Sequence, residues 1–140
     1  MKKPVLFFLF LLAFNFLNAQ NYFFKNFTVE NGLPQSQVLC VFQDQSGRLW
    51  IGTNQGGIAR YDGSAFENIN ETNGLAGNVV FSITQSKSGL FYIGTYKGLS
   101  IYDGKNFKNK TAENGLNSNN VVKVLEDKKG KIWLGTSKGV

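Results

Sequence analysis

A repeat with a period of 41 to 42 residues constrains this chain more than any other feature. The tripeptide Asn-Gly-Leu occurs at residues 31–33, 73–75 and 114–116, so its copies lie 42 and 41 residues apart. Seventeen residues after the leucine of each copy, an aromatic residue opens a second shared motif. This motif reads aromatic-(Ile or Leu)-Gly-Thr, at residues 50–53, 92–95 and 133–136. Periods of roughly 20 to 50 residues are typical of solenoids, propellers and other repeat arrays.

Each repeat unit has the pattern of four short strands. In the first unit the strands are expected at residues 37–44, 48–53, 58–61 and 65–69, and Asp62-Gly63 is a strong signal for a tight hairpin. The dense glycines argue against helices. Four strands in 41 to 42 residues is the pattern of a propeller blade. The predicted fold is therefore all-β, with β-propeller blades of four antiparallel strands in an incomplete ring.

The repeat also sets the expected domain boundaries. We expect a partial β-propeller over residues 20–140, with one blade at 33–70, a second at 75–111 and part of a third at 116–140. Residues 24–33 align without gaps to the last strands of the two blades, which predicts a lone outer strand at 22–30. Because a propeller ring needs at least about four blades, the chain is expected to be a fragment of one.

Residues 1–19 have the order of a secretory signal peptide. Lys2 and Lys3 precede an almost wholly apolar stretch at residues 5–17, and Ala19 supplies a small residue before a predicted cut ahead of Gln20. Export is therefore expected, and an uncleaved anchor is the alternative because the residue three positions before the cut is large.

Two segments resemble a known family. Residues 32–38 (Gly-Leu-Pro-Gln-Ser-Gln-Val) and 44–53 (Asp-Gln-Ser-Gly-Arg-Leu-Trp-Ile-Gly-Thr) closely resemble the two-component regulator propeller repeat. The second copy departs from this pattern, with Ser86 and Tyr92 in place of the aspartate and the tryptophan. The WD-type and kelch repeats carry different signatures.

The resemblance implies a function and a location. Propellers of this family form the periplasmic sensor region of bacterial signalling proteins, in front of a membrane segment and a histidine kinase or another output domain. The implied partners are a carbohydrate-derived or other small ligand, the remaining blades, and the downstream signalling domains of the same protein. The implied location is the periplasmic side of the inner membrane, with secretion or the cell surface as the alternative.

The composition excludes several other classes of function. The chain has no histidine, so it has no phosphoacceptor histidine, no His-based catalytic triad and no His-ligated metal. Cys40 is the only cysteine, and Asp62 and Asp103 are explained as hairpin turn residues. No catalytic residue, metal site or cofactor is predicted. The net charge of +6 is scattered rather than gathered in a stripe, which argues against nucleic-acid binding.

The repeated motif residues are expected to serve the scaffold. Trp50, Tyr92 and Trp133 are predicted to pack between blades, and the glycines two positions after each aromatic are predicted to allow a close backbone approach. A ligand site should instead use polar loop residues at one end of the blades, where amides and an aromatic ring suit a sugar-like ligand. The predicted ligand-binding residues are Gln35, Gln37, Asn54, Gln55, Asn78, Tyr96, Lys97, Asn119, Asn120 and Lys138.

Three functions stay open from the residues alone. The family resemblance favours a sensor ectodomain, and the alternatives are a secreted polysaccharide-acting propeller enzyme and a surface adhesion scaffold. The first and last blades should expose packing faces and unpaired strand edges. The isolated chain is therefore expected to be unstable or oligomeric, with a homodimer as one form.

Overall fold

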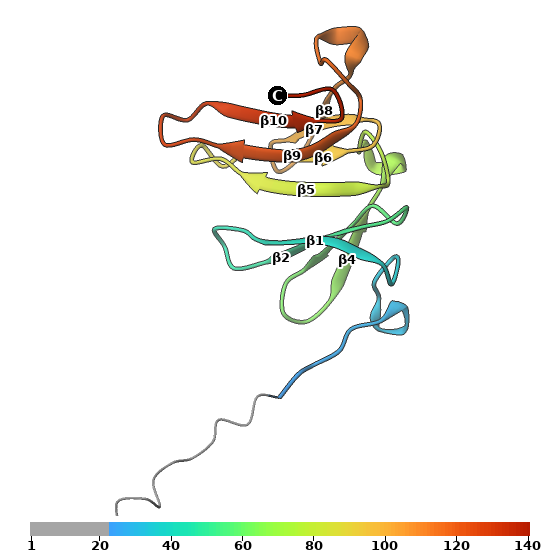
Figure 1. Cartoon of the computed structure of the whole chain (residues 1–140). Coiled ribbons are helices and arrows are strands. Elements are labelled where there is room, and N and C mark those ends of the chain that lie inside the picture. The colour runs from blue at the N-terminus through green and yellow to red at the C-terminus, as the bar shows by residue number, and fades with distance from the viewer. Residues whose placement is uncertain (1–22) are drawn as a thin grey trace, which may run out of the picture.

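The computed structural model describes residues 23–140, so the predicted signal peptide lies outside the described residues. The described chain forms three antiparallel sheets, which lie one after another without closing a ring (Figure 1). We call them the first, second and third blades. The first blade contains β1 (Val38–Gln43), β2 (Leu49–Thr53), β3 (Ile58–Tyr61) and β4 (Phe66–Ile69). The second contains β5 (Val80–Gln85), β6 (Phe91–Thr95), β7 (Gly98–Tyr102) and β8 (Phe107–Lys110). The third contains β9 (Val121–Glu126) and β10 (Ile132–Thr136).

Each strand pairs with the next one along the chain, which confirms the predicted all-β propeller blades. The sheet register separates two faces of the first blade. Val41 lies opposite Ile51 on one face, and Phe42 lies opposite Trp50 on the other. The first face is called the leading face, because its counterpart in the second blade contacts the preceding blade. The second is called the trailing face.

The Asn-Gly-Leu motif closes a short 3-10 turn before each blade. These turns are η2 (Val29–Asn31), η3 (Glu71–Asn73) and η4 (Ala112–Asn114). In η3 the backbone N–H of Asn70 donates to Asn73 Oδ1 at 3.0 Å, and Gly74 then ends the turn with a φ of 104°. This left-handed conformation favours glycine. Leu75 follows directly and is buried, so it anchors the loop in the core.

The main core lies in the joint between the first and second blades. The fully buried Trp50 side chain packs against Phe91, with ring centroids 4.3 Å apart, and against Tyr102 at 6.0 Å. At the next joint, Tyr92 packs against a buried cluster that includes Val121 and Val124. The prediction that the motif aromatics pack between blades is confirmed at these two joints.

The motif glycines accommodate a valine from the following blade. A Cβ atom on Gly52 would lie 2.8 Å from Val80 Cγ1, and one on Gly94 would lie 2.6 Å from the carbonyl oxygen of Val121. Both distances are below normal van der Waals contact, so a larger residue cannot fit without movement. The predicted close approach is confirmed at these two glycines.

The predicted outer strand at residues 22–30 is wrong for the residues that the structure describes. Residues 23–28 form no strand, and residues 29–31 belong to η2. An outer strand needs the third strand of its own blade as a partner, and residues 23–140 supply none that precedes it. Phe27 and Leu33 instead pack onto the leading face of the first blade, beside Ile51.

No helix within residues 23–140 is long and apolar enough to cross a membrane.

Candidate functional site

Two kinds of loop meet at one end of the blades. One kind joins the fourth strand of a blade to the first strand of the next, and the other joins the second strand of a blade to its third. In the second blade, the backbone N–H of Tyr96 donates to the carbonyl of Val79 at 3.1 Å. In the third blade, the N–H of Ser137 donates to the carbonyl of Asn120 at 3.1 Å. Backbone hydrogen bonds therefore hold the two kinds of loop side by side.

The threonine of the repeated motif shapes the second-to-third strand loop. Thr95 Oγ1 donates to the carbonyl of Gly98 at 2.8 Å, and Thr53 Oγ1 donates to the carbonyl of Gly57 at the same distance. Both threonines are fully buried. These hydrogen bonds turn the chain tightly after the second strand, so that the two residues after each threonine project from the end of the blade.

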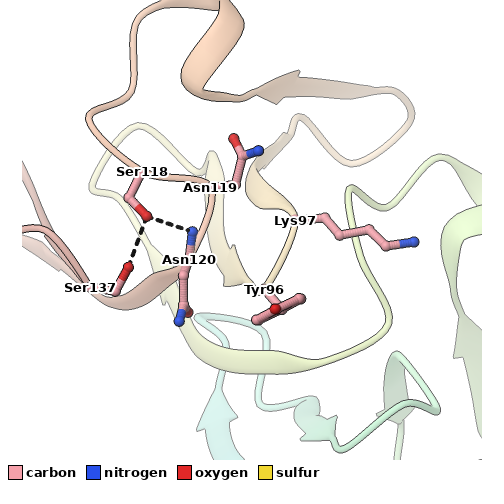
Figure 2. Close-up of a pocket in the computed structure, with 6 residues that line it drawn as sticks. All are labelled: Tyr96, Lys97, Ser118, Asn119, Asn120 and Ser137. Atoms are coloured by element: carbon pink, nitrogen blue, oxygen red, sulfur yellow. Dashed lines mark hydrogen bonds between the residues drawn. The ribbon is translucent and has the colours of Figure 1, made fainter.

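One hollow among the described loops lies where the second and third blades meet (Figure 2). It has a volume of about 550 Å³. Its lining is made of hydroxyl, amide, amine and phenol groups, with no carboxylate. The lining residues are Tyr96, Lys97, Ser118, Asn119, Asn120 and Ser137. The Tyr96 side chain is 59% exposed, so its ring is available to a ligand.

Polar groups in this hollow are partly engaged with each other. The hydroxyls of Ser118 and Ser137 lie 2.9 Å apart, and the backbone N–H of Asn120 donates to Ser118 Oγ at 3.1 Å, as Figure 2 shows. The side-chain oxygen of Asn120 is buried and has no hydrogen-bond partner. Buried polar atoms are rarely left unpaired, so this acceptor is suited to a donor from water or a ligand.

A second hollow of about 290 Å³ lies between the first and second blades. Tyr96 and Lys97 line both hollows, and Gln55, Glu71 and Asn78 line only the second. Lys97 Nζ lies 2.9 and 3.1 Å from the two carboxylate oxygens of Glu71. This hydrogen bond from Lys97 lowers the pKa of Glu71, so the carboxylate stays ionised at neutral pH and balances the charge of the lysine.

The ten predicted residues divide into three groups. Tyr96, Lys97, Asn119 and Asn120 line the larger hollow, and Gln55 and Asn78 join Tyr96 and Lys97 at the smaller one. The remaining four residues line neither hollow; they are Gln35, Gln37, Asn54 and Lys138.

Several of these amides also support the loops themselves. Asn54 Nδ2 donates to Gln37 Oε1 at 2.7 Å. Asn78 Oδ1 accepts the backbone N–H of Glu71 at 2.9 Å, and Asn119 Oδ1 accepts that of Ala112 at 2.6 Å. Asn78 and Asn119 occupy the same position in successive repeats, so this hydrogen bond is a repeated part of the scaffold.

The sequence reasoning missed three lining residues with polar side chains: Ser118, Ser137 and Glu71. Ser137 holds the same repeat position as Tyr96 and Asn54, so aligning the loops as well as the motifs would have found it. Ser118 holds the position of Gln35 and could have been found in the same way. Nothing in the sequence indicated that Glu71 would pair with Lys97, because 26 residues separate them.

The hairpin aspartates behave as turn residues. Asp62 Oδ1 accepts the backbone N–H groups of Ala65 and Ser64 at 2.9 and 2.8 Å. These hydrogen bonds lower the pKa of Asp62 to about 2. A carboxyl group with so low a pKa is a poor general acid at neutral pH.

Among the side chains of residues 23–140, no three His, Cys, Asp or Glu gather closely enough to hold a metal ion.

Comparisons with known proteins agree with the repeat pattern. The two-component regulator propeller family matches residues 32–55 and 115–138. A histidine kinase of Formosa agariphila is 45% identical over 53 residues, which are 36% of this chain and 4% of that relative.

Two solved extracellular domains from B. thetaiotaomicron share the fold. One, from a one component system, superposes with a TM-score of 0.65 at 22% identity, over 76% of this chain and 17% of that chain. The other, from a hybrid two component system, gives a TM-score of 0.50 at 24% identity, over 74% of this chain and 21% of that chain. The chain thus spans about a fifth of these domains.

Proposed function

Because this chain carries two-component regulator propeller repeats, we propose that it is part of the ligand-sensing propeller of an exported two-component signalling protein. The ligand is a small, uncharged, hydroxyl-rich molecule such as an oligosaccharide. It binds at the end of the blades where the two kinds of loop meet, and its binding is passed to a histidine kinase output of the same protein.

The observation that carries this proposal is the position of Tyr96. Its exposed ring borders both hollows, and amides and hydroxyls from the neighbouring loops surround it. A sugar ring offers a flat face of C–H groups and a rim of hydroxyls. An aromatic side chain supports the face, and amides can both donate to and accept from the rim. Asn120 and Asn119 supply amides at the rim of the larger hollow.

The charge balance of the site favours an uncharged ligand. Lys97 is the only cationic residue that lines either hollow in the described structure, and it is paired with Glu71. The pair leaves no net positive charge to attract an anion. A phosphorylated or sulfated ligand would have to displace Glu71 from Lys97 before binding.

The signalling role and the location rest on the family. The family match, and the similarity of one segment to a histidine kinase, support a sensor that precedes a kinase domain. The fold shared with extracellular domains supports an exported propeller, which we place on the periplasmic side of the inner membrane.

The test is a calorimetric titration of the ectodomain that carries these blades against neutral and anionic oligosaccharides. We expect a neutral oligosaccharide to bind, and we expect Tyr96→Ala to weaken its binding at least about tenfold, a typical loss for a stacking aromatic. Phe24→Ala removes another exposed aromatic away from the loops and is the matched control. Unchanged affinity in Tyr96→Ala would refute the site, and binding of anionic ligands alone would refute the ligand class.

A further inference from the structure

An ion pair lines the smaller hollow, which lies between two complete four-stranded blades. Lys97 Nζ donates to Glu71 Oε2 at 2.9 Å and to Glu71 Oε1 at 3.1 Å. In Figure 2 the Lys97 side chain extends away from Ser118 and Ser137, and its ammonium group meets Glu71, which lines only the smaller hollow. The side chains of Lys97 and Glu71 are 59% and 35% exposed, so a ligand in this hollow can contact both.

The pair leaves a donor and an acceptor available next to each other. A lysine ammonium has three N–H donors, and a carboxylate can accept about four hydrogen bonds. Lys97 uses two donors on Glu71. Glu71 Oε1 also accepts the backbone N–H of Asn78 at 3.2 Å, whereas Oε2 accepts only Lys97 among the described residues. One N–H of Lys97 and one lone pair of Glu71 Oε2 therefore remain for a ligand, on two atoms that lie 2.9 Å apart.

Other hydrogen bonds hold both residues of the pair in place. Asn78 Oδ1 accepts the backbone N–H of Glu71 at 2.9 Å, and the backbone N–H of Asn78 donates back to the Glu71 carboxylate. The backbone N–H of Lys97 donates at 3.2 Å to the hydroxyl of Thr95, which is fully buried. Groups that are ordered before binding lose less conformational entropy when the ligand arrives, which favours affinity.

The carboxylate of Glu71 is not part of the repeated scaffold. Its position is held by Ala112 in the third repeat and by Val29 in the first. The hydrogen bond that shapes the loop is nevertheless kept, because Asn119 Oδ1 accepts the backbone N–H of Ala112 just as Asn78 Oδ1 accepts that of Glu71. The loop therefore forms without a carboxylate, and the fold of the blade does not explain why Glu71 is present.

We infer that Lys97 and Glu71 together clamp two hydroxyl groups on adjacent ring carbons of the ligand, an inference that rests on the proposed function. Lys97 Nζ donates to one hydroxyl oxygen, and the neighbouring hydroxyl donates to Glu71 Oε2. Tyr96 lines the same hollow and supports the face of the sugar ring that carries this diol. Each hydrogen bond involves a charged group, and such bonds are roughly twice as strong as neutral ones. The clamp selects a sugar unit with a free vicinal diol.

The test is calorimetry on the ectodomain that carries these blades, with neutral tetrasaccharides of glucose, galactose, mannose and arabinose as probes. Glu71→Ala removes the acceptor and reproduces the third repeat, and Lys97→Met removes the donor while keeping a long side chain. Each variant should bind the tightest probe at least about tenfold more weakly than the wild type does. The double variant should lose little more affinity than either single variant, because each residue of the clamp holds the other in place.

Monodeoxy analogues of the tightest probe separate a clamp from a structural strut. In the wild type, removal of either diol hydroxyl should weaken binding about tenfold. In Glu71→Ala and Lys97→Met, the parent probe and these analogues should bind alike. Lys108→Met removes an exposed lysine on β8, away from the loops, and is the matched control that should bind like the wild type. Circular dichroism establishes that each variant is folded.

The outcomes separate the clamp from the proposed function. The clamp would be overturned, and the proposed function would stand, if Tyr96→Ala weakens binding while Glu71→Ala and Lys97→Met do not. A strut, and no clamp, is shown if these two variants still discriminate between the parent probe and its deoxy analogues as the wild type does. A wild-type ectodomain that binds no neutral probe would refute the proposed function and the clamp with it.

Discussion

The carboxylate of Asp44 accepts the indole N–H of Trp50 at 2.9 Å, inside the joint between the first and second blades. The same carboxylate accepts hydrogen bonds from the backbone N–H groups of Ser46 and Arg48. It also forms an ion pair with the Arg48 side chain. One buried aspartate therefore fixes the turn between two strands and orients the aromatic side chain that packs against the next blade. In the repeat, the aspartate and the tryptophan form a single structural unit.

Removing this carboxylate should destabilise the fold. In Asp44→Ala the indole N–H of Trp50 stays buried without an acceptor, and the turn loses the hydrogen bonds that hold it. We expect the free energy of unfolding to fall by about 1–3 kcal/mol, measured by urea denaturation. Asp62→Ala is the matched control, because Asp62 caps an exposed hairpin in the same blade. Asp62→Ala should lower the free energy of unfolding clearly less than Asp44→Ala does. An equal decrease in both variants would contradict the role given to the indole.

The same carboxylate should make stability depend on pH in the acid range. Burial alone would raise the pKa of Asp44, but the hydrogen bonds from Trp50, Ser46 and Arg48 hold it well below its ordinary value of 3.8. The folded chain then binds fewer protons than the unfolded chain. The contribution of Asp44 to the free energy of unfolding is complete well above pH 3.8. It is lost as the pH falls through 3.8 toward the lower pKa of Asp44 in the folded chain.

We therefore expect the free energy of unfolding to change little between about pH 5 and 8 and to fall steeply below about pH 4. Asp44→Asn should be less stable at neutral pH and should show a shallower fall in acid, measured by urea denaturation at a series of pH values. Asp62, with its pKa lowered to about 2, contributes to the fall in both proteins. Parallel pH profiles of the variant and the wild type would contradict the assignment to Asp44.

Much of the blade could be predicted from the sequence because the repeat supplies two or three copies of each position. The third strand of the first blade spans Ile58–Tyr61, as the pattern predicts. The first, second and fourth strands differ from their predicted ranges only at their ends. Asn-Gly-Leu marked a loop, but its 3-10 turn depends on the side chain of Asn73 accepting a backbone N–H, which no periodicity reveals.

The site was less predictable than the fold. The position of Tyr96 follows from the repeat, because the motif threonine places the next residue at the end of the blade. The pairing of Lys97 with Glu71 joins a loop to a different loop far along the chain, so it depends on how blades stack. The outer strand predicted at residues 22–30 failed for a related reason. A strand needs a partner, and sequence similarity to β4 and β8 does not supply one.

The motif glycines should differ in how well they tolerate a methyl group. A Cβ atom on Gly52 or Gly94 would overlap atoms of the following blade, and one on Gly52 would also lie 2.5 Å from Cys40 Sγ of its own blade. We expect Gly52→Ala and Gly94→Ala to lower the free energy of unfolding by about 1–3 kcal/mol. Gly135→Ala is the matched control, with the same motif and only ordinary contacts around the added methyl. Gly135→Ala should leave the free energy of unfolding nearly unchanged in dilute solution. A decrease equal to that in Gly94→Ala would contradict the close-approach explanation.

The second blade offers a test of whether aspartate and tryptophan act as a pair. Ser86 and Tyr92 replace both residues together. The Ser86 hydroxyl accepts the backbone N–H of Leu90, donates to the Leu90 carbonyl and lies 2.8 Å from the Ser88 hydroxyl. Ser86→Asp alone would bury a carboxylate without an indole donor, and Tyr92→Trp alone would bury an indole N–H without an acceptor. Each single variant should therefore be less stable than the wild type.

The double variant should recover stability beyond the sum of the single changes. We expect a favourable coupling of about 1 kcal/mol or more in a double-mutant cycle measured by urea denaturation at pH 7. Repeating the cycle near pH 2 protonates much of the new carboxylate, so the coupling should shrink there. The corresponding cycle with Ser86→Asp and Tyr96→Phe is the control, since Tyr96 lies in the loops at the end of the blade, and its coupling should be close to zero. Additive effects of Ser86→Asp and Tyr92→Trp at pH 7 would mean that the aspartate serves the turn alone and that the tryptophan is held by packing.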